Sequence, residues 1–512
     1  MGIIIKESIK SSIAAYVGII IGVVNVILLY TKFLSPSQLG LTRVLQDTTL
    51  LIVSFAQLGT PFVIIKFYPQ FKNKAQGDYG FLTLAVVYAL SGFIMFSVLF
   101  FLFHSYFINL YASKSPLLLS YYYLIVPFVG GLILLNLFES YIIAHTKVFF
   151  PTLIREVLIK LFNMILIILF SLKFFSFSNY LLLSISIYFI GAIILIFYIK
   201  KLGILFIKPK LSIFKTLKFG SILNYGAFTI LGGIGYMLAT KIDVIMLPAY
   251  RGLRKTAIYV IAIFIASLLE IPKRMLSKAS VSTLNFAFKN NDTAQIEELY
   301  KKTSINLFLA GSFIVIIIWS NINDFFYIIP KGEIYAGGKI VLFIFLIGKL
   351  FDLLSGINNE IILYSKYYKY TILFILFLGM MTVVTNVIFI PKFGITGAAL
   401  ATFISVFIYM VVKIIFVYKK FNIHPFQKET FKMIFVLLIF LLAAIQLNYL
   451  SENFSLNNLI GIDSGLIFHL SNIFIKSGIL FILFLFTVVK LNISDDFSLL
   501  IYKYIKKFKI GN

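Results

Sequence analysis

The 512-residue chain is 61% hydrophobic and only 12% charged. A soluble globular protein carries about 25% charged residues, so this composition excludes a water-soluble fold and indicates a chain whose solvent is lipid. The formal net charge of +26 would suggest a nucleic-acid partner in a soluble domain. Here most lysines and arginines lie between apolar runs, as topology control requires, and an anionic substrate is a second reason for the same charge.

Apolar runs recur along the whole chain, and a membrane-spanning helix needs about 20 of such residues. The runs predict an all-α polytopic membrane protein with about 14 transmembrane helices. The first run follows Lys6 and Lys10 without a small-residue cleavage site after it, so we expect a retained helix and not a signal peptide. The predicted spans are 12–31, 44–65, 81–103, 118–143, 152–172, 180–199, 222–247, 256–275, 305–329, 339–362, 370–390, 396–418, 431–449 and 466–489.

Positive charge is unevenly distributed over the predicted loops. With the N-terminus inside, about 29 lysines and arginines fall in inner segments and about 10 in outer ones, which is the expected positive-inside asymmetry. The basic segments 200–218, 273–302 and 503–509 carry most of the inner charge. The sequence therefore predicts a multi-pass protein of the bacterial inner (cytoplasmic) membrane with both termini in the cytoplasm.

The chain also contains an internal duplication with a spacing of about 220 residues, a common feature of transporters. The link FLSPSQLGLTRV (33–44) before a helix with QLGTP (57–61) matches LPAYRGLRKTAIYV (247–260) before a helix with LEIP (269–272). ESYIIAHTK (139–147) likewise matches NEIILYSK (359–366). We expect an N-lobe of six helices (1–203), a basic cytoplasmic linker (204–215), a C-lobe of six helices (216–422), and two further helices with a basic tail (423–512).

The most specific stretch is NVIFIPKFGITGAALAT (386–402). Proline cannot continue a helical hydrogen-bond ladder, so Pro391 is expected to end the eleventh helix, and Gly394 to allow a tight outer turn. The small residues that follow give the twelfth helix a face for close packing in lipid. They are Gly397, Ala398, Ala399 and Ala401.

This hairpin resembles the one before the twelfth helix of the polysaccharide-transport and O-antigen flippases, which belong to the multidrug/oligosaccharidyl-lipid/polysaccharide (MOP) exporter superfamily. YTKFLSPSQLGLTRV (30–44) and DVIMLPAYRGLRKTAIYVIA (243–262) also resemble theirs, although the family's acidic residue before Gly-Ile-Tyr is replaced by the run from Lys255 to Tyr259. The resemblance covers about residues 10–420 and implies a MATE-like fold, with two lobes around a central cavity and alternating access. It also implies an undecaprenyl-diphosphate-linked oligosaccharide as cargo. The extra helix pair resembles that of lipid II flippases.

Several charges fall inside predicted spans, where a charge is costly unless it faces a cavity or a partner. Lys349 and Asp352 share one face of the tenth helix, so they either compensate each other or line a cavity. Lys241 and Asp243 are two residues apart and do not face each other. We expect a cationic cavity that binds the cargo's phosphates through Lys241, Lys349, Arg155 and Arg274, with Asp352 and Asp243 as candidates for ion coupling.

Charged residues near helix ends are candidates for gates that close the cavity. On the inner side these are Glu139, Glu270 and Glu360, which are expected to end the fourth, eighth and tenth helices and to meet Arg155, Lys273 and Arg274. On the outer side they are Arg43 and Asp47. Interfacial anchoring is the alternative for all of them, and Glu156–Lys160 reads as an ordinary i,i+4 pair.

The remaining polar residues suggest no catalytic chemistry. Lys413 is expected to snorkel towards the inner interface, and Lys476 has no partner that the sequence reveals. The four histidines, His104, His145, His424 and His469, have no metal-ligand spacing, and there is no cysteine or phosphate-binding loop. Asn25 and Gln57 are expected to form interhelical hydrogen bonds. We expect no cofactor, with H⁺ or Na⁺ as the candidate coupling ion.

The sequence therefore favours a flippase of lipid-linked oligosaccharide over an enzyme. A lipid II flippase or a cation-coupled multidrug exporter of the same superfamily is an alternative, although a drug exporter predicts a more acidic cavity. A membrane polysaccharide polymerase or ligase is the alternative from another class, but the short outer loops lack carboxylate clusters. The expected partners are the lipid-linked oligosaccharide, membrane lipid, a polysaccharide polymerase and chain-length machinery, with no nucleic acid and a monomeric state.

Overall fold

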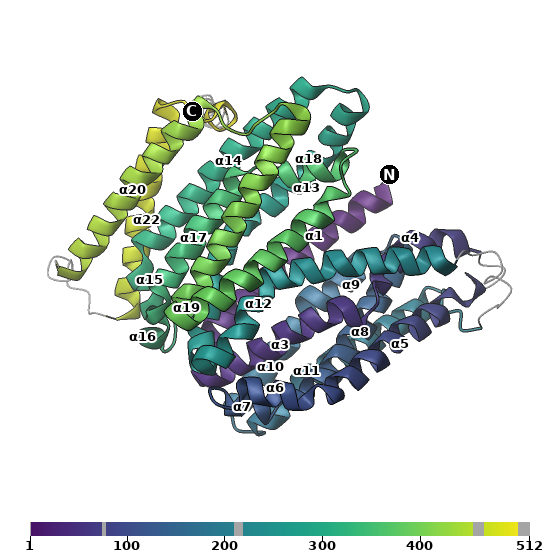
Figure 1. Ribbon diagram of the computed structural model, residues 1–512. Helices are drawn as coiled ribbons and strands as arrows, with labels where there is room; N and C mark the ends of the chain where they lie inside the picture. The colour runs from purple at the N-terminus through teal and green to yellow at the C-terminus, as the bar shows by residue number, and fades with distance from the viewer. Residues whose placement is uncertain (1, 74–77, 209–218, 454–464, 500–512) are drawn as a thin grey trace. The chain divides into compact units, whose positions relative to one another are not determined.

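A computed structural model describes residues 2–73, 78–208, 219–453 and 465–499. Throughout these ranges the regular elements are helices, so the predicted all-α fold is confirmed (Figure 1). The predicted basic tail and residues 209–215 of the predicted linker lie outside the described residues.

The number of membrane-spanning segments agrees with the sequence. In the described chain, 11 helices are long and apolar enough to cross a membrane. Two of these, Gly220–Lys289 and Tyr370–Phe421, are each interrupted by a glycine with non-helical dihedral angles. One further apolar segment, 149–171, is divided by a π-helical turn. Splitting the two long helices and adding this segment gives the fourteen predicted spans.

The first part of the chain forms the predicted first six spans, with short helices between them. Two spans contain π-helical turns, which interrupt the α-helical hydrogen bonds locally and which the apolar pattern did not predict. The elements are α1 (Gly2–Val23), η1 (Val24–Tyr30), α2 (Thr31–Phe33), α3 (Pro36–Ala56), α4 (Thr60–Phe71), α5 (Phe81–Leu102), α6 (His104–Tyr111), α7 (Pro116–Leu119), η3 (Tyr122–Leu124), α8 (Ile125–Ala144), α9 (Phe149–Thr152), η4 (Leu153–Leu158), α10 (Ile159–Ser171) and α11 (Phe177–Lys201).

The rest of the chain forms the remaining spans, and the last two helices extend beyond the repeated part. The elements are α12 (Phe219–Ala266), η6 (Ser267–Leu269), α13 (Glu270–Lys289), α14 (Thr293–Ser320), α15 (Ile322–Ile328), α16 (Gly332–Tyr335), η7 (Ala336–Gly338), α17 (Lys339–Leu354), α18 (Asn358–Tyr364), α19 (Tyr370–Phe421), α20 (Lys428–Asn453) and α22 (Leu466–Lys490).

Three corners join consecutive spans within very few residues. Between α2 and α3 the chain turns at Ser35, whose side chain accepts from Gln38 N in a capping box. Within α12 and α19 it turns at Gly252 (φ 77°) and Gly394 (φ 63°), left-handed dihedral angles that favour glycine. The expectation that Pro391 ends its helix is wrong, because the helix continues past it and breaks at Gly394.

The eighth span is longer than predicted. Its helix continues through η6 and α13 to Lys289 and does not end near residue 275. After residue 275 the helix continues through the mixed stretch LSKASVST (276–283), which a search for apolar runs misses although its residues form a helix. Glu270 therefore opens α13 and does not end the eighth helix, which corrects its expected position. The following helix, α14, begins at Thr293, where the Asp292 side chain accepts from Gln295 N.

The small residues of the twelfth span pack closely. Ala398, Ala399 and Ala401 are fully buried, and a side chain on Gly397 would collide with the Phe389 carbonyl. This is the close contact expected of small residues between membrane helices.

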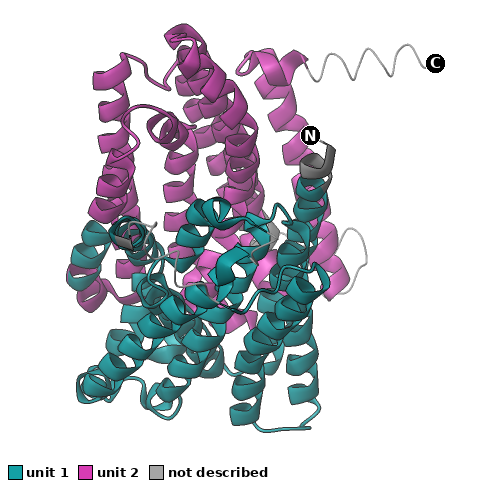
Figure 2. Ribbon diagram, turned by 90° about the vertical axis from the view of Figure 1, so that its right-hand side faces the viewer, with its two compact units in different colours: residues 1–257, 379–387 teal, residues 258–378, 388–512 magenta. Residues whose placement is uncertain are grey.

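The chain divides into two compact units (Figure 2). Unit 1 contains residues 1–257 and 379–387, and unit 2 contains 258–378 and 388–512. This division places residues 219–257 in unit 1, whereas the sequence assigns them to the C-lobe; the lobes themselves remain a prediction. In unit 2, α13, α14, α18 and α19 meet in an apolar cluster that includes Leu284, Tyr300, Ile361 and Val417.

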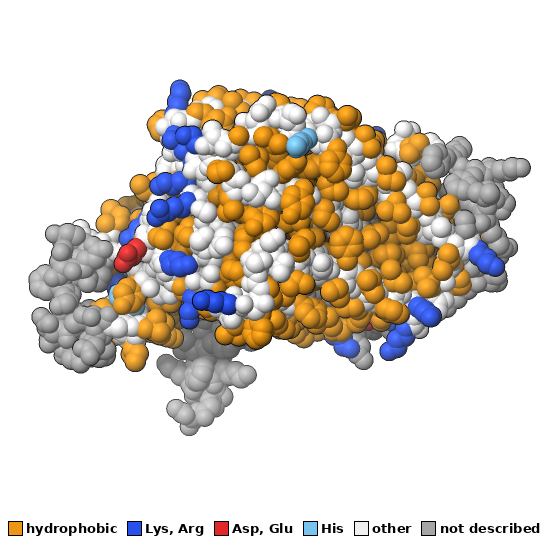
Figure 3. All heavy atoms as spheres, turned by 90° about the horizontal axis from the view of Figure 1, so that it is seen from below, with side chains coloured by type: hydrophobic (Ala, Val, Ile, Leu, Met, Phe, Trp, Pro, Cys, Tyr) orange, Lys and Arg blue, Asp and Glu red, His pale blue; other side chains and the backbone are white. Residues whose placement is uncertain are grey.

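Large apolar side chains also cover the surface. On the face drawn in Figure 3, hydrophobic side chains fill the middle, and most lysines and arginines lie towards the margins. Phe474 of α22 is 79% exposed and Leu102 of α5 is 72% exposed. Soluble monomers rarely expose apolar patches of this extent, so this surface suits contact with lipid.

Candidate functional site

In unit 1, the predicted base of the seventh span pairs with a carboxylate of the second. Lys241 Nζ of α12 lies 2.9 Å from Asp47 Oδ1 of α3, and Asp47 is buried. Asp243 is also buried and accepts a hydrogen bond from Val244 N. Arg43 donates to Gln46 Oε1 over 3.2 Å. Thus Lys241 and Asp243 do not pair with each other, as their spacing predicts.

A second ion pair in unit 1 joins the fourth and fifth spans. Arg155 of η4 donates through Nε and Nη2 to both oxygens of Glu139, with the shortest contact at 2.6 Å. The Nη2 atom also donates to Asn136 Oδ1, and the amide of Asn136 donates to Gln57 Oε1 over 3.0 Å. This two-point contact uses the planar fork of arginine. Arg155 and Glu139 therefore meet, as the inner-gate interpretation expects.

The other polar residues expected to link helices in unit 1 do so. Asn25 donates to the Lys160 carbonyl over 2.8 Å. Lys160 Nζ pairs with Glu156 at 2.7 Å and donates to the Gly18 carbonyl. These contacts fix the first span against the fifth.

In unit 2, two ion pairs connect α13 and α17. Lys349 pairs with Glu270, and Asp352 Oδ1 lies 2.7 Å from Lys273 Nζ. Lys349 and Asp352 are thus not a self-compensating pair, because each has a partner of opposite charge on the neighbouring helix. Glu270 also accepts from Arg274 over 2.7 Å, and the Arg274 side chain is the most exposed of the predicted bases.

Lys413 belongs to the same region, and the expectation that it snorkels to the interface is wrong. The residue is only 4% exposed. Its Nζ donates to Asn359 Oδ1 over 3.2 Å and lies 3.4 Å from Tyr409 Oη. Asp352, Glu360 and Lys273 are the charged groups that act on it. Snorkelling would give up these polar partners, which lie inside the helix bundle.

We call these residues of unit 2 the charge group. It contains four bases, Lys273, Arg274, Lys349 and Lys413, and three carboxylates, Glu270, Asp352 and Glu360. Of the predicted binding, coupling and gate residues, it includes Lys349, Arg274, Asp352, Glu270 and Glu360. Lys413 was not predicted to belong to this group, although a single lysine within an apolar run indicates a buried polar contact.

Lys476, unexplained by the sequence, also has a partner in unit 2. Its Nζ lies 2.8 Å from Asp324 Oδ2, and His469 Nδ1 lies 2.7 Å from Asp324 Oδ1. Asp324 lies in α15 and both basic residues lie in α22. The seven-residue spacing of His469 and Lys476 could have predicted a shared partner, because it places both residues on one helix face.

The chemistry that these arrangements support is exchange of ionic partners. Each predicted binding base lies against a carboxylate, so an anionic group that binds the base competes with that carboxylate. No cluster of His, Cys, Asp and Glu in the described chain could hold a metal ion.

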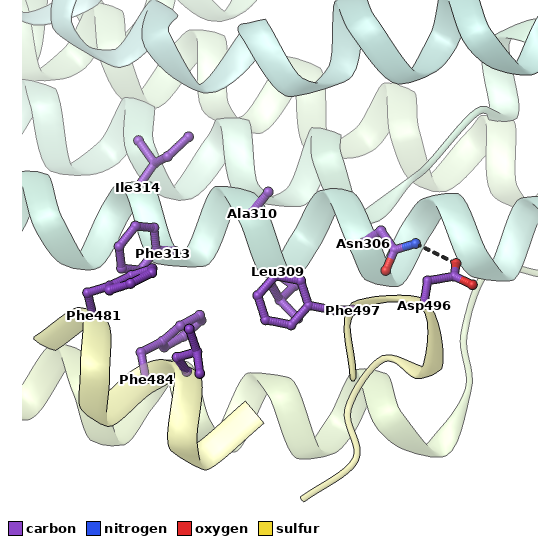
Figure 4. A pocket seen from close by; sticks show the side chains of 10 residues that line it. Asn306, Leu309, Ala310, Phe313, Ile314, Phe481, Phe484, Asp496 and Phe497 are labelled. Carbon is purple, nitrogen blue, oxygen red and sulfur yellow. Dashed lines mark hydrogen bonds between the residues drawn. The ribbon is translucent and has the colours of Figure 1, made fainter. Parts of the chain in front are cut away.

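Unit 2 also has an apolar cavity of about 430 Å³. Figure 4 shows side chains of α14 and α22 around it, including Phe313, Phe481 and Phe484. At one end, Asn306 donates to Asp496 Oδ2 over 3.0 Å (Figure 4).

Comparison with known proteins finds similarity only in structure. No family model and no curated protein sequence matches the chain. An inward-closed structure of the lipid II flippase MurJ matches with a TM-score of 0.66 and 16% identity, covering 94% of this chain and 98% of that one. An inward-facing multidrug resistance MATE family transporter of the MOP superfamily matches with a TM-score of 0.62 and 14% identity, covering 77% and 92%.

A MOP superfamily transporter from Pyrococcus furiosus, whose binding pocket is described as having reverse polarity, also matches. Its TM-score is 0.56 at 14% identity, and the match covers 82% of this chain and 95% of that one. At such identities the likeness establishes the fold alone. The chain is therefore an all-α polytopic membrane protein with the fold of the MOP-superfamily transporters.

Proposed function

We propose that this protein is a flippase that moves an undecaprenyl-diphosphate-linked oligosaccharide, such as an O-antigen unit, across the bacterial inner membrane by alternating access. The observation that carries the proposal is the charge group of unit 2, in which bases outnumber carboxylates within a helix bundle. Charged residues inside membrane proteins usually mark a transport pathway. The excess of bases suits an anionic cargo.

The cargo's diphosphate would bind by partner exchange. Lys349 is bound to Glu270, which also binds Arg274. A phosphate oxygen that takes Lys349 leaves Glu270 with Arg274, so the carboxylate stays compensated. Charge-assisted bonds to phosphate are about twice as strong as neutral hydrogen bonds, which favours the exchange. The lipid tail remains in the bilayer while the diphosphate and sugar cross.

Ion coupling would use carboxylates, with Asp352 and Asp243 as the candidates. Asp352 is bound by Lys273, and Asp243 is buried in α12. A proton or Na⁺ that neutralises Asp352 frees Lys273 for another partner, and this would connect the ion gradient to the binding of the cargo.

A lipid II flippase is the second candidate. Its support is coverage, since the MurJ structure matches 94% of this chain whereas the two MATE-type transporters above match 77% and 82%. The cargoes of the two candidates have a diphosphate on the same lipid and differ in the sugar. A drug exporter fits less well, because cationic drugs need an excess of carboxylates. A polymerase or ligase has no support from the solved structures described above.

Complementation in two bacterial strains tests the proposal. One strain lacks its O-antigen flippase and the other is depleted of its lipid II flippase; both carry the matching glycan pathway. We expect surface glycan to return in the first strain, and growth without lysis in the second would favour lipid II as cargo. A protein that is well expressed in the membrane and restores neither would contradict the proposal.

A further inference from the structure

Two basic residues of α22, the last described helix, contact the same carboxylate. Lys476 is only 7% exposed and Asp324 only 4%. Asp324 Oδ2 accepts from Lys476 Nζ over 2.8 Å, and its Oδ1 lies 2.7 Å from His469 Nδ1. A buried carboxylate thus uses both oxygens to hold α22 against α15. None of these three residues belongs to the charge group.

The geometry leaves one ring nitrogen of His469 for a further proton. When Asp324 is ionised it can only accept, so Nδ1 donates to it and carries the ring proton. Among the described residues, Nε2 makes no hydrogen bond. The His469 side chain is 20% exposed and its ring stacks on Tyr327 at 3.7 Å, which is itself mostly exposed. A proton therefore reaches Nε2 from the surface.

The charged groups around His469 are few. α15 supplies Asp324 and Tyr327, α22 supplies Lys476, and Lys339 reaches the neighbouring Asn323. α14 and α20 also pack against α22. Their early turns carry Glu297, Glu298, Lys301, Lys302, Lys428, Glu429 and Lys432, and Glu452 lies in the last turn of α20.

We propose that Asp324, His469 and Lys476 form a proton-binding site that sets how firmly α22 is held against α15. With His469 neutral, the carboxylate and the ammonium balance and the group has no net charge. A proton on Nε2 turns the contact at 2.7 Å into an imidazolium–carboxylate pair, which is a stronger bond. Repulsion between the imidazolium and the ammonium acts over a longer distance, because the carboxylate lies between them. Proton uptake therefore tightens the attachment of α22.

The site acts on the apolar cavity through the same helix. Phe481 and Phe484, which line the cavity opposite α14 in Figure 4, follow Lys476 on α22 by about one to two turns. A shift of α22 relative to α15 at Asp324 would therefore also move the side chains of α22 that line the cavity.

Two spectroscopic measurements on the purified full-length protein in lipid nanodiscs test the site. With only four histidines in the chain, ¹⁵N NMR resolves each imidazole, and His469→Gln assigns the signal of interest. We expect this signal to change when the protein is acidified, and the change to differ in Asp324→Asn, because the group that faces Nδ1 is then neutral. A His469 signal that does not respond to acidification, or responds in the same way in Asp324→Asn, would overturn the proposal.

The second readout is Trp319, the only tryptophan in the chain. It lies one residue before the end of α14, its carbonyl accepts from Asn448 of α20, and its ring packs on Phe343. We expect its fluorescence to change with pH in the unaltered protein and in the control His104→Gln, but not in His469→Gln. A change that persists in His469→Gln would contradict the proposal even if Asp324→Asn does not fold.

Discussion

Lys241 and Lys349 each lie against a carboxylate with 31% of the side chain exposed. Such a pair is neither deeply buried nor fully screened, so a competing anion can reach the ammonium. If the cargo's diphosphate uses these lysines, Lys241→Ala or Lys349→Ala should reduce surface glycan by about tenfold, the effect of roughly 1.4 kcal/mol of lost binding. Lys→Arg should be tolerated better, since the charge is kept. Glycan is measured in a strain that lacks its own flippase, with membrane protein level in parallel.

The matched control for these lysines is Lys302. It pairs with Glu298 one turn away on α14, and half of its side chain is exposed, so Lys302→Ala should leave glycan unchanged. Lys413 is unsuitable as a control because it is buried among polar partners. Full glycan from a well-expressed Lys241→Ala, Lys349→Ala double variant would remove both lysines from the binding site.

At the same scale, the sequence predicts which residues are polar inside the membrane but only some of their partners. Hydrocarbon penalises every charge in a span, and so Lys349, Asp352 and Lys241 could be selected from the sequence. Their partners depend on helix packing, which i,i+3 and i,i+4 spacing does not contain. The ion pair within α13, Glu270–Arg274, follows this spacing, whereas Lys273–Asp352 joins residues 79 apart.

Among the elements, the glycine corners are the most sensitive to substitution. Gly252 and Gly394 have positive φ, and a side chain at Gly252 would also lie 2.9 Å from the Lys114 carbonyl. Gly252→Ala or Gly394→Ala should cost about 1–2 kcal/mol and lower the midpoint of thermal unfolding in detergent. Gly478 in α22 has nothing within 4 Å of an added Cβ, so Gly478→Ala is the matched control and should not lower the midpoint. Equal midpoints for all three variants would refute this account of the corners.

The elements themselves could be predicted largely from one physical requirement. Because backbone groups in lipid must be satisfied within the segment, long apolar runs form helices, and the fourteen runs did so. The requirement does not extend to segments of mixed polarity such as 276–283, and the extension of α13 to Lys289 was therefore missed. Nor does it predict π-helical turns such as Val24–Tyr30, because hydropathy does not distinguish them from α-helical turns.

For the whole molecule, the loop charges predict the orientation in the membrane. The asymmetry of about 29 inner and 10 outer bases favours cytoplasmic termini. Reporter fusions at Lys210 and Lys428 should therefore be active in the cytoplasm, and fusions at Ser113 and Asn453 in the periplasm. A periplasmic signal at Lys210 would invalidate both the orientation and the predicted lobe boundaries.

Alternating access makes a second prediction for the whole molecule, which concerns the second and eighth spans. In unit 1 the backbone of Gly40 in α3 packs against the Leu253 carbonyl just after the Gly252 corner. A transporter that opens at this end has to separate the two segments, so a covalent link between them should hold it closed. Cysteines placed at Arg43 and Arg254 should cross-link with a short bifunctional maleimide, and the linked protein should not transport.

Because the chain has no cysteine of its own, the effect of the link can be assigned without background. A pair at Glu298 and Lys302, one turn apart on α14 and both largely exposed, controls for labelling and should leave transport intact. Transport is followed as the appearance of glycan after the reagent is added to cells that make the lipid-linked unit. Since α3 and the part of α12 after Gly252 lie in contact in this structure, a pair that never links would mean that its contact does not occur in the membrane. A pair that links while transport continues would show that these segments need not separate, and alternating access by opening at this end would then fail for this chain.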